Sequence, residues 1–198
     1  MNPHAPVTRT LSAIVTTSPV CDCCVSILWI VVPREVIALY ISVIGASECD
    51  EEMAEVAYRL GWEIARRHHV LVCGGLGGVM DAAAHGAHDA NGFSVGILPG
   101  PDRRGASKWL SVAVPTDMGH ARNAVVALAG DALIAVGGGF GTLSEIAFGL
   151  KMGKPVIGLG AWEPAEGGSE GQWCAKVSTP GEAVATAEEL AGSTRPWS

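Results

Sequence analysis

From residue 39 onward, short apolar runs alternate with longer segments whose apolar residues recur every three or four positions. Short runs rich in β-branched residues and bounded by glycine or proline are typical of buried strands, whereas the longer period is that of a helix packed on one face. The predicted strands are residues 40–45, 70–73, 94–98, 110–114, 131–136 and 156–159. Each of the first five is followed by a loop or a helix before the next apolar run begins.

The predicted helices carry start and stop signals of their own. The helix expected at 50–67 begins with three acidic residues and ends with two arginines, which suits the helix dipole at both ends. Near the C-terminus, Thr179 and Glu182 form a capping box with Pro180 at the first helical position. This last helix is expected to end near Ala191. Other helices are expected to reach about residue 90, to run over about 119–128 and to end at 152, and residues 160–178 are expected to form a loop.

Buried strands that alternate with helices indicate a parallel sheet covered on both faces. The fold class predicted from the sequence is therefore α/β, a doubly wound, mostly parallel, Rossmann-like sheet in a single domain. In such sheets ligands bind beyond the carboxyl ends of the strands. Candidate functional residues are therefore sought in the loops that follow each strand.

The first 38 residues differ in character from the rest. They show no clear periodicity, and the apolar run at 21–32 is shorter than the roughly 20 residues that span a bilayer. We expect 1–38 to be an extension that is disordered or foreign to the native protein, 39–192 to be the nucleotide-binding domain and 193–198 to be a tail. The six cysteines lack the spacing of a disulfide framework or a zinc site, so reduced thiols, a cytoplasmic location and no metal are expected.

Composition limits the function classes. Hydrophobic residues make up 48% of the chain and charged residues 17%, a combination that excludes intrinsic disorder of the whole chain. The formal net charge of −7 would repel a nucleic-acid backbone, so neither nucleic acid nor a membrane is expected as a partner. A single small anion could still bind, because a few backbone amides and one arginine suffice. The unusual feature is glycine, with 26 among 198 residues.

Eight of these 26 glycines lie in two loops, at 74–78 and 137–141, that each join a predicted strand to a predicted helix. Glycine lets backbone N–H groups approach an anion, and a helix start adds partial positive charge. Two such loops at one edge of a sheet predict a phosphate site, although close packing of strand and helix also favours glycine. Neither loop has the Lys-Ser/Thr end of a Walker A motif or the spacing of a standard dinucleotide fingerprint.

Two charged residues near these loops have open interpretations. Arg122 lies in the first turn of its predicted helix, where a cation opposes the dipole, so it indicates an anionic ligand, a structural salt bridge or a snorkelling side chain. Glu145 follows Thr142 by three residues, so the two could form a capping box. Glu145 also lies off the apolar stripe of its helix and could face the ligand. The sequence does not separate a capping from a catalytic glutamate.

Four motifs together resemble those of LONELY GUY-type proteins, which are cytokinin riboside 5′-monophosphate phosphoribohydrolases often mislabelled lysine decarboxylases. GGFGTLSE at 138–145 resembles the PGGxGTxxE signature of that family, and GGLGGVM at 74–80 is similar to its GGxxGLM loop. GHARNA at 119–124 lies where the family has MxxRK, and GAS at 45–47 resembles its first glycine-serine turn. The resemblance covers about residues 39–192. Lysine decarboxylation is rejected, because neither glycine loop holds a lysine that could bind pyridoxal phosphate.

Three departures separate the chain from that signature. Gly137 replaces its proline, Gly119 its methionine and Asn123 its lysine. With these changes the chain is more similar to the sister branch that contains molybdenum cofactor carrier proteins. This resemblance implies a Rossmann-like fold, homo-oligomers, and a ligand that is a phosphate-bearing pterin or is nucleotide-like.

The resemblance also implies roles for single residues. Arg122 would hold the ligand, and Glu145 would stabilise a ribosyl cation or orient water. Ligand or phosphate contacts are expected from both glycine loops, from the turn after the first strand and from the neighbour of Arg122, namely Gly45, Ser47, Gly74, Gly75, Gly77, Gly138, Gly139, Gly141, Thr142 and Asn123.

Two functions from different classes follow. One is hydrolysis of the N-glycosidic bond of a nucleoside 5′-monophosphate, for which a carboxylate near an oxocarbenium-like transition state is suitable. The other is a non-catalytic carrier or sensor of a nucleotide or of a phosphorylated pterin such as molybdenum cofactor. Neither function requires a cofactor, and the sequence leaves open whether the protein is an enzyme. The expected partners are a small phosphorylated ligand and further copies of the chain, as a homodimer or a higher homo-oligomer.

Overall fold

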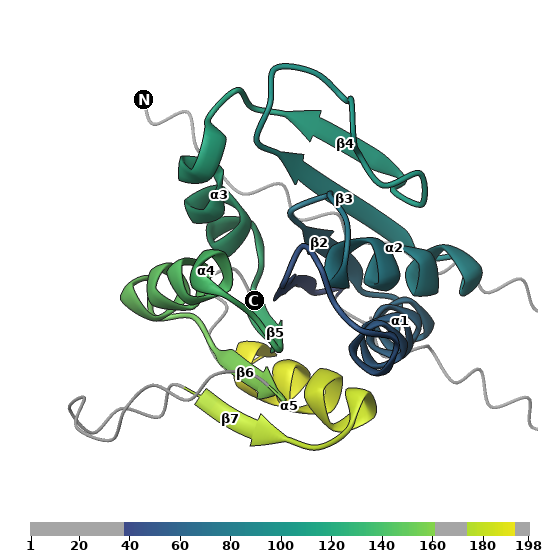
Figure 1. Ribbon diagram of the computed structural model, residues 1–198. Helices are drawn as coiled ribbons and strands as arrows, with labels where there is room; N and C mark the ends of the chain where they lie inside the picture. The colour runs from purple at the N-terminus through teal and green to yellow at the C-terminus, as the bar shows by residue number, and fades with distance from the viewer. Residues whose placement is uncertain (1–37, 161–173, 193–198) are drawn as a thin grey trace, which may run out of the picture. The chain divides into compact units, whose positions relative to one another are not determined.

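The structure is a computed structural model that describes residues 38–160 and 174–192. These residues form a seven-stranded sheet in which every neighbouring pair is parallel, with the order β4-β3-β2-β1-β5-β6-β7. The predicted doubly wound, Rossmann-like α/β fold is confirmed (Figure 1). The strands are β1 (Tyr40–Gly45), β2 (Val70–Cys73), β3 (Phe93–Leu98), β4 (Val112–Pro115), β5 (Ala132–Val136), β6 (Val156–Leu159) and β7 (Cys174–Val177). The expectations for residues 1–37 and 193–198, including the three cysteines near the N-terminus, lie outside the described residues.

Helices cover both faces of the sheet. The first face carries α1 (Glu51–Arg66), α2 (Val79–Asp89) and α5 (Pro180–Gly192), whereas the second carries α3 (Arg122–Ala129), preceded by the 3-10 turn η1 (Gly119–Ala121), and α4 (Phe140–Lys151) (Figure 1). Two hydrophobic clusters match these layers. Leu60, Ile64 and Val184 belong to the cluster under the first set of helices, and Val126 and Ile146 to the other.

The central strands of the sheet are apolar because helices cover them on both faces. Every residue of β5 is buried, as expected for a parallel strand covered on both faces. β1 pairs with β2 on one side and with β5 on the other, so Ser42 lies opposite both Val72 and Leu133. The order in which strands are added reverses at β1, because β2, β3 and β4 lie on one side of it and β5, β6 and β7 on the other. A doubly wound sheet opens a crevice at such a switch point.

The predicted starts of the helices α1 and α5 are confirmed. The carboxylate of Asp50 accepts a hydrogen bond from the backbone N–H of Met53 at 2.8 Å and caps α1. At the start of α5, the Glu182 N–H donates to the Thr179 hydroxyl at 3.3 Å, and the Thr179 N–H donates to the Glu182 carboxylate at 3.1 Å. Hydrogen bonds from Ser178 and Thr179 hold the pKa of Glu182 below its ordinary value.

The expectation of a continuous loop at 160–178 is wrong at its end. β7 lies there and pairs in parallel with β6, with Ala175 opposite Ile157. The strand is short and carries a lysine, Lys176, which is typical of a sheet edge and removes the apolar pattern by which a strand is recognised. The fourth strand also begins two residues later than predicted and ends on Pro115, which an edge strand tolerates.

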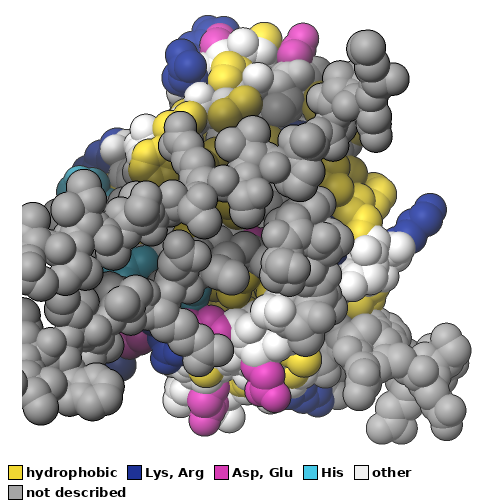
Figure 2. Space-filling view, turned by 180° about the vertical axis from the view of Figure 1, so that it is seen from behind, with side chains coloured by type: hydrophobic (Ala, Val, Ile, Leu, Met, Phe, Trp, Pro, Cys, Tyr) yellow, Lys and Arg dark blue, Asp and Glu magenta, His cyan; other side chains and the backbone are white. Residues whose placement is uncertain are grey.

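The surface that can be described has no single chemical character. On the side shown in Figure 2, acidic and basic side chains lie next to one another with apolar side chains between them. Among the described residues on this side, no continuous basic surface of the kind that binds nucleic acid is visible. No helix within residues 38–160 and 174–192 is long and apolar enough to cross a membrane.

Candidate functional site

A cavity of about 640 Å³ lies at the carboxyl ends of the strands, where the switch point predicts a ligand site. The loops after β1, β2, β3, β4 and β5 all contribute to it. We call it the strand-end pocket, and its described lining consists of Gly45, Ala46, Ser47, Glu48, Leu76, Met80, Pro99, Gly119, His120, Arg122, Asn123, Gly139, Phe140, Gly141, Thr142 and Glu145.

The second glycine loop brings the start of α4 to this pocket. Gly139 is the N-cap of α4, and the first turn from Phe140 to Thr142 lines the pocket together with it. The first N–H groups of a helix have no acceptor within the helix, and the dipole adds positive charge there, so such a turn suits an anion. Gly138 lies behind this turn with a φ of 133° and faces the Thr142 side chain instead of the pocket.

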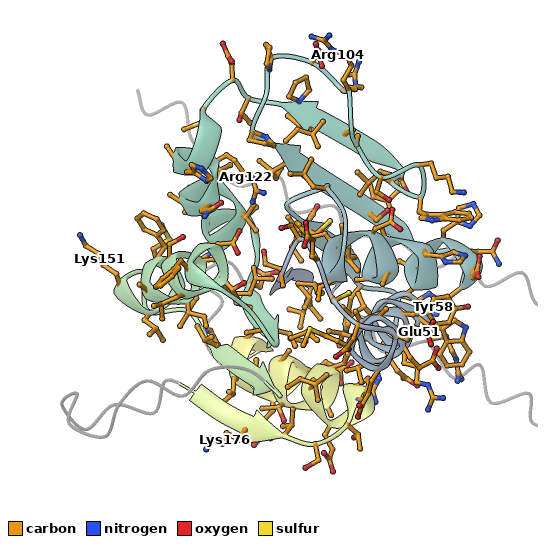
Figure 3. The ribbon with its side chains drawn as sticks, viewed as in Figure 1. Glu51, Tyr58, Arg104, Arg122, Lys151 and Lys176 are labelled. Atoms are coloured by element: carbon orange, nitrogen blue, oxygen red, sulfur yellow. The ribbon has the colours of Figure 1, made fainter. Side chains whose placement is uncertain are left out.

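Arg122 and Glu145 form a buried ion pair at one wall of the pocket. Arg122 is the first residue of α3 and Glu145 lies in the second turn of α4; their exposed fractions are 7% and 5%. The Nη1 atom of Arg122 donates to Oε1 of Glu145 at 3.1 Å. Figure 3 shows Arg122 extending from α3 toward the strand ends, whereas Lys151 at the end of α4 points outward. The structural salt bridge is therefore present, and it lies in the wall of a ligand-sized cavity.

The capping-box interpretation of Thr142 and Glu145 is wrong. The N-cap position belongs to Gly139, which lies three residues before Thr142, and no side chain caps this helix. Thr142 is already inside the first turn, so its hydroxyl is not placed to cap the helix. Glu145 therefore has no capping role and directs its carboxylate to Arg122.

Burial dominates the protonation of Glu145. Loss of solvent raises the pKa of its carboxyl to about 7, although the charge and hydrogen bond of Arg122 act in the opposite direction. The Nε atom of Arg122 is buried and has no hydrogen-bond partner. The pair is therefore incompletely satisfied, with one buried donor unused and a carboxyl that changes charge near neutral pH.

Asn123 links the two helices that carry this pair. Its Nδ2 atom donates to the Ser144 hydroxyl at 2.8 Å and to the Gly141 carbonyl at 3.4 Å. The Ser144 hydroxyl in turn donates to the same carbonyl at 2.7 Å. Asn123 lines the pocket, but its amide donors are directed to α4. The bonds that it makes hold the first turn of α4 in place.

The first glycine loop contributes less than the sequence suggests. Gly74, Gly75 and Gly77, all expected to contact ligand, are absent from the described lining of the pocket. Gly74 faces the guanidinium of Arg122, Gly75 packs against Gly96 of β3, and Gly77 lies near the carbonyl of Ser47. The predicted residues that the structure does bring together at the pocket are Gly45, Ser47, Arg122, Asn123, Gly139, Gly141, Thr142 and Glu145.

The apolar part of the lining was not found from the sequence. Leu76, Met80 and Pro99 follow the ends of β2 and β3 and form walls of the pocket. Their positions just after strand ends are a usable signal, but apolar residues there are equally expected in the core. Within the described ranges, no cluster of His, Cys, Asp and Glu could hold a metal ion.

The geometry can be compared with known proteins. The model of the SLOG cluster4 family matches residues 38–189. The chain belongs to the SLOG cluster4 family. A relative from Archaeoglobus fulgidus, an uncharacterised protein, is 52% identical over 121 residues, which are 61% of this chain and 80% of that relative. Over 105 residues the chain is 30% identical to a cytokinin riboside 5′-monophosphate phosphoribohydrolase of Arabidopsis thaliana, covering 52% of this chain and 45% of that enzyme.

Solved structures resemble this SLOG cluster4 member over more of its length than the two sequence relatives do. The molybdenum cofactor carrier protein of Chlamydomonas reinhardtii superposes with a TM-score of 0.72 and 33% identity, covering 78% of this chain and 99% of that protein. The resemblance to the LONELY GUY-type superfamily, near the branch of molybdenum cofactor carriers, is confirmed.

Proposed function

We propose that this protein binds a phosphorylated small molecule in the strand-end pocket and acts as a carrier of a phosphorylated pterin such as molybdenum cofactor. The observation that carries the proposal is the shared position of the α4 start and Arg122 on one cavity of about 640 Å³. Known pockets for small-molecule ligands have volumes of roughly 300–1,000 Å³, so this cavity is large enough for such a ligand. Similarity to the carrier of Chlamydomonas reinhardtii over nearly all of that protein supports the choice of ligand.

In this proposal the parts of the pocket have separate roles. The phosphate lies at the first turn of α4, where Gly139 to Thr142 line the cavity and the first N–H groups of the helix have no acceptor within it. Arg122 adds the positive charge. The planar ring system packs on the apolar walls that Leu76, Met80 and Pro99 form. Gly45 and Ser47 close the pocket from the end of β1.

A thermal-shift experiment on the full chain tests the proposal. The probes are isolated molybdenum cofactor, AMP and, as the form without phosphate, adenosine. We expect the phosphorylated probes to raise the unfolding temperature and adenosine to have no effect. Arg122→Ala should abolish the shift, whereas Arg104→Ala should keep it, because Arg104 is exposed on the β3–β4 loop and pairs with Asp102 (Figure 3). If no phosphorylated probe stabilises the protein, the pocket has another use.

A second candidate function is hydrolysis of a nucleoside 5′-monophosphate to the free base and ribose 5-phosphate. In this reaction the bond from C1′ to the base nitrogen breaks, water adds to C1′, and the base leaves with a proton. The observation that favours it is the Glu145 carboxyl, which is buried beside the pocket and has a pKa of about 7. Such a group can stabilise a ribosyl cation as a carboxylate or accept a proton from water.

Release of base distinguishes the two functions. With AMP as the probe, an enzyme yields free adenine that chromatography detects, and Glu145→Gln lowers the rate about 10²–10⁴-fold, the usual contribution of a positioned acid or base. A carrier binds ligand without releasing base, and at pH 7 Glu145→Gln leaves its affinity almost intact. Binding without any base release at high protein concentration excludes the hydrolase.

We also propose that the partner of this chain is a second copy of itself. Leu128 of α3 and Leu143, Phe148 and Met152 at or near α4 are large apolar side chains that remain exposed on the same face of the sheet. Exposed apolar residues grouped in this way are typical of protein–protein contacts.

A further inference from the structure

The guanidinium of Arg122 occupies space that a side chain at position 74 would otherwise fill. A Cβ atom added to Gly74 would lie 2.5 Å from Nη2 and 2.6 Å from Nη1 of Arg122. It would also lie 2.6 Å from the sulfur of Met80. Gly74 is the first residue after β2, so the end of this central strand forms the floor on which the arginine head group lies.

Conformational freedom does not explain a glycine at this position. The φ angle of Gly74 lies outside the left-handed region, unlike that of Gly75 at 74°. Gly74 is also absent from the described lining of the pocket, so its N–H is not placed as a ligand contact. What remains is the space that a missing Cβ leaves, and Arg122 and Met80 fill that space.

We infer that Gly74 is a positioning residue of the strand-end pocket, which holds the Arg122 guanidinium against Glu145 by having no side chain. The inference rests on the proposed function only for the use of the pocket, because the pairing of Arg122 with Glu145 exists without ligand. It replaces the expectation that Gly74 contacts phosphate. It also explains how the guanidinium is oriented although its Nε has no partner. The 3.1 Å hydrogen bond to Glu145 holds one end of it, and close packing against Gly74 restricts its remaining movement.

The fold should survive a side chain at position 74. The three atoms nearest to the new Cβ belong to the Arg122 and Met80 side chains, which are long and flexible, and none of the three is backbone. Gly74→Ala should therefore displace Arg122 and Met80 and leave β2 in place. Displacement of Arg122 weakens its hold on Glu145, which is the measurable consequence.

The carboxyl of Glu145 reports this displacement. Its neighbours that carry or can carry charge are Arg122 on α3, the Cys73 thiol at the end of β2, and Glu48 and His120 elsewhere in the pocket lining. Of these, only Arg122 meets the added Cβ. Arg122 lowers the pKa of Glu145 while burial raises it, so moving the guanidinium away should raise the pKa further above 7. An opposite charge at this range contributes about 1–3 pKa units, so a rise of about one unit is expected.

Carbon-13 NMR titration of glutamate carboxyls in the ligand-free, full-length protein tests the inference. Glu145→Gln identifies the resonance by removing it. We expect Gly74→Ala to raise the titration midpoint of Glu145 by about one unit. Gly181→Ala is the matched control, because a Cβ there meets nothing within 4 Å and the residue lies at the start of α5, away from the pocket.

A second variant makes the test independent of simple damage. Arg122→Ala should also raise the midpoint, and Gly74→Ala added to it should cause no further change, because the guanidinium that the new Cβ displaces is then gone and Met80 carries no charge. If Gly74→Ala alone fails to fold, Arg122→Ala in the same chain should restore folding. An unchanged midpoint in Gly74→Ala, equal effects of Gly74→Ala with and without Arg122, or misfolding in both backgrounds overturns the inference. Because no ligand is used, these outcomes are separate from failure of the thermal-shift panel.

Discussion

At the scale of single residues, we expect the charge state of the Arg122–Glu145 pair to set the affinity of the pocket for an anion. A phosphate at the first turn of α4 lies near the Glu145 carboxyl, so a carboxylate there repels it and competes for Arg122. A protonated Glu145 does neither. The pKa of about 7, which burial raises from the ordinary value of 4.5, places this change within the range of cellular pH.

We therefore predict that affinity for a phosphate ligand falls as pH rises through 7. Below this pH Glu145 is protonated and the positive charge of Arg122 is available to the ligand, whereas above it binding requires uptake of a proton. One linked proton weakens binding by at most about tenfold per pH unit. Calorimetric titration with AMP between pH 7 and 8.5, where the phosphate is already a dianion, measures the slope.

Glu145→Gln provides the control for this dependence. Glutamine keeps the shape of the side chain but does not titrate, so affinity in this variant should be nearly constant over the same range. Glu48 and His120 also line the pocket and stay intact in it. A slope of the same size in Glu145→Gln would assign the effect to another group and contradict the prediction.

The positions of residues were predictable where a sequence motif fixes the backbone. Contacts between side chains of different elements were not. The sequence placed Gly139, Gly141 and Thr142 at a helix start, and they lie at the start of α4 in the lining of the strand-end pocket. The partner of Glu145 could not be found, because Arg122 is 23 residues away and the two meet only through the packing of α3 on α4. The local interpretation as a capping box was wrong because α4 begins at Phe140, before Thr142.

At the scale of elements, α3 is a short helix whose end is held by a residue beyond the next helix. The Nζ atom of Lys154, in the turn before β6, donates to the carbonyls of Leu128 and Gly130. These carbonyls lie at the C-terminus of α3, where acceptors have no partner within the helix and the dipole is negative. Partial burial lowers the pKa of Lys154, so its ammonium group depends on these contacts.

Lys154→Met is predicted to destabilise the protein. Methionine keeps much of the apolar stem but removes both hydrogen bonds, and loss of a charged donor at a half-buried site costs about 1–2 kcal/mol. Urea unfolding measures the change in the free energy of unfolding. Lys151→Met is the matched control, because Lys151 points outward from α4 and should have little effect (Figure 3). Equal losses in the two variants would show that Lys154 does not act through α3.

Apart from β7, the existence of the elements was predictable from the sequence, but close contacts between elements were not. The apolar period of α1 and the small residues of α2 indicated two helices on the sheet. Nothing in either pattern showed that Gly61 lies against the backbone of α2, where a Cβ would come within 1.9 Å of the Ala83 carbonyl oxygen. Such a contact depends on the crossing of two helices, and each sequence pattern describes only its own helix.

At the scale of the whole molecule, the path of the chain brings the site together. β4 lies at one edge of the sheet and β5 next to the central β1, so the connection through η1 and α3 crosses from the edge to the centre. It does so on the face opposite α1 and α2, as Figure 1 shows. Arg122 is thereby carried to Glu145. The sequence predicted alternating strands and their parallel direction, but strand order follows from packing of all layers together.

The same face of the sheet carries the proposed contact with a second copy of the chain. Leu128 is 61% exposed at the end of α3, and Leu143, Phe148 and Met152 extend the apolar surface along and just beyond α4. In water such a surface is stabilised by burial against an equal surface related by twofold symmetry. We predict a dimer of the full-length chain by light scattering after size-exclusion chromatography, and monomers for a variant with Leu128→Asp and Phe148→Asp. Phe93→Asp, at the start of β3 with 51% exposure, should remain dimeric. A wild-type mass of one chain throughout a concentration series would show that this apolar face has no second copy on it.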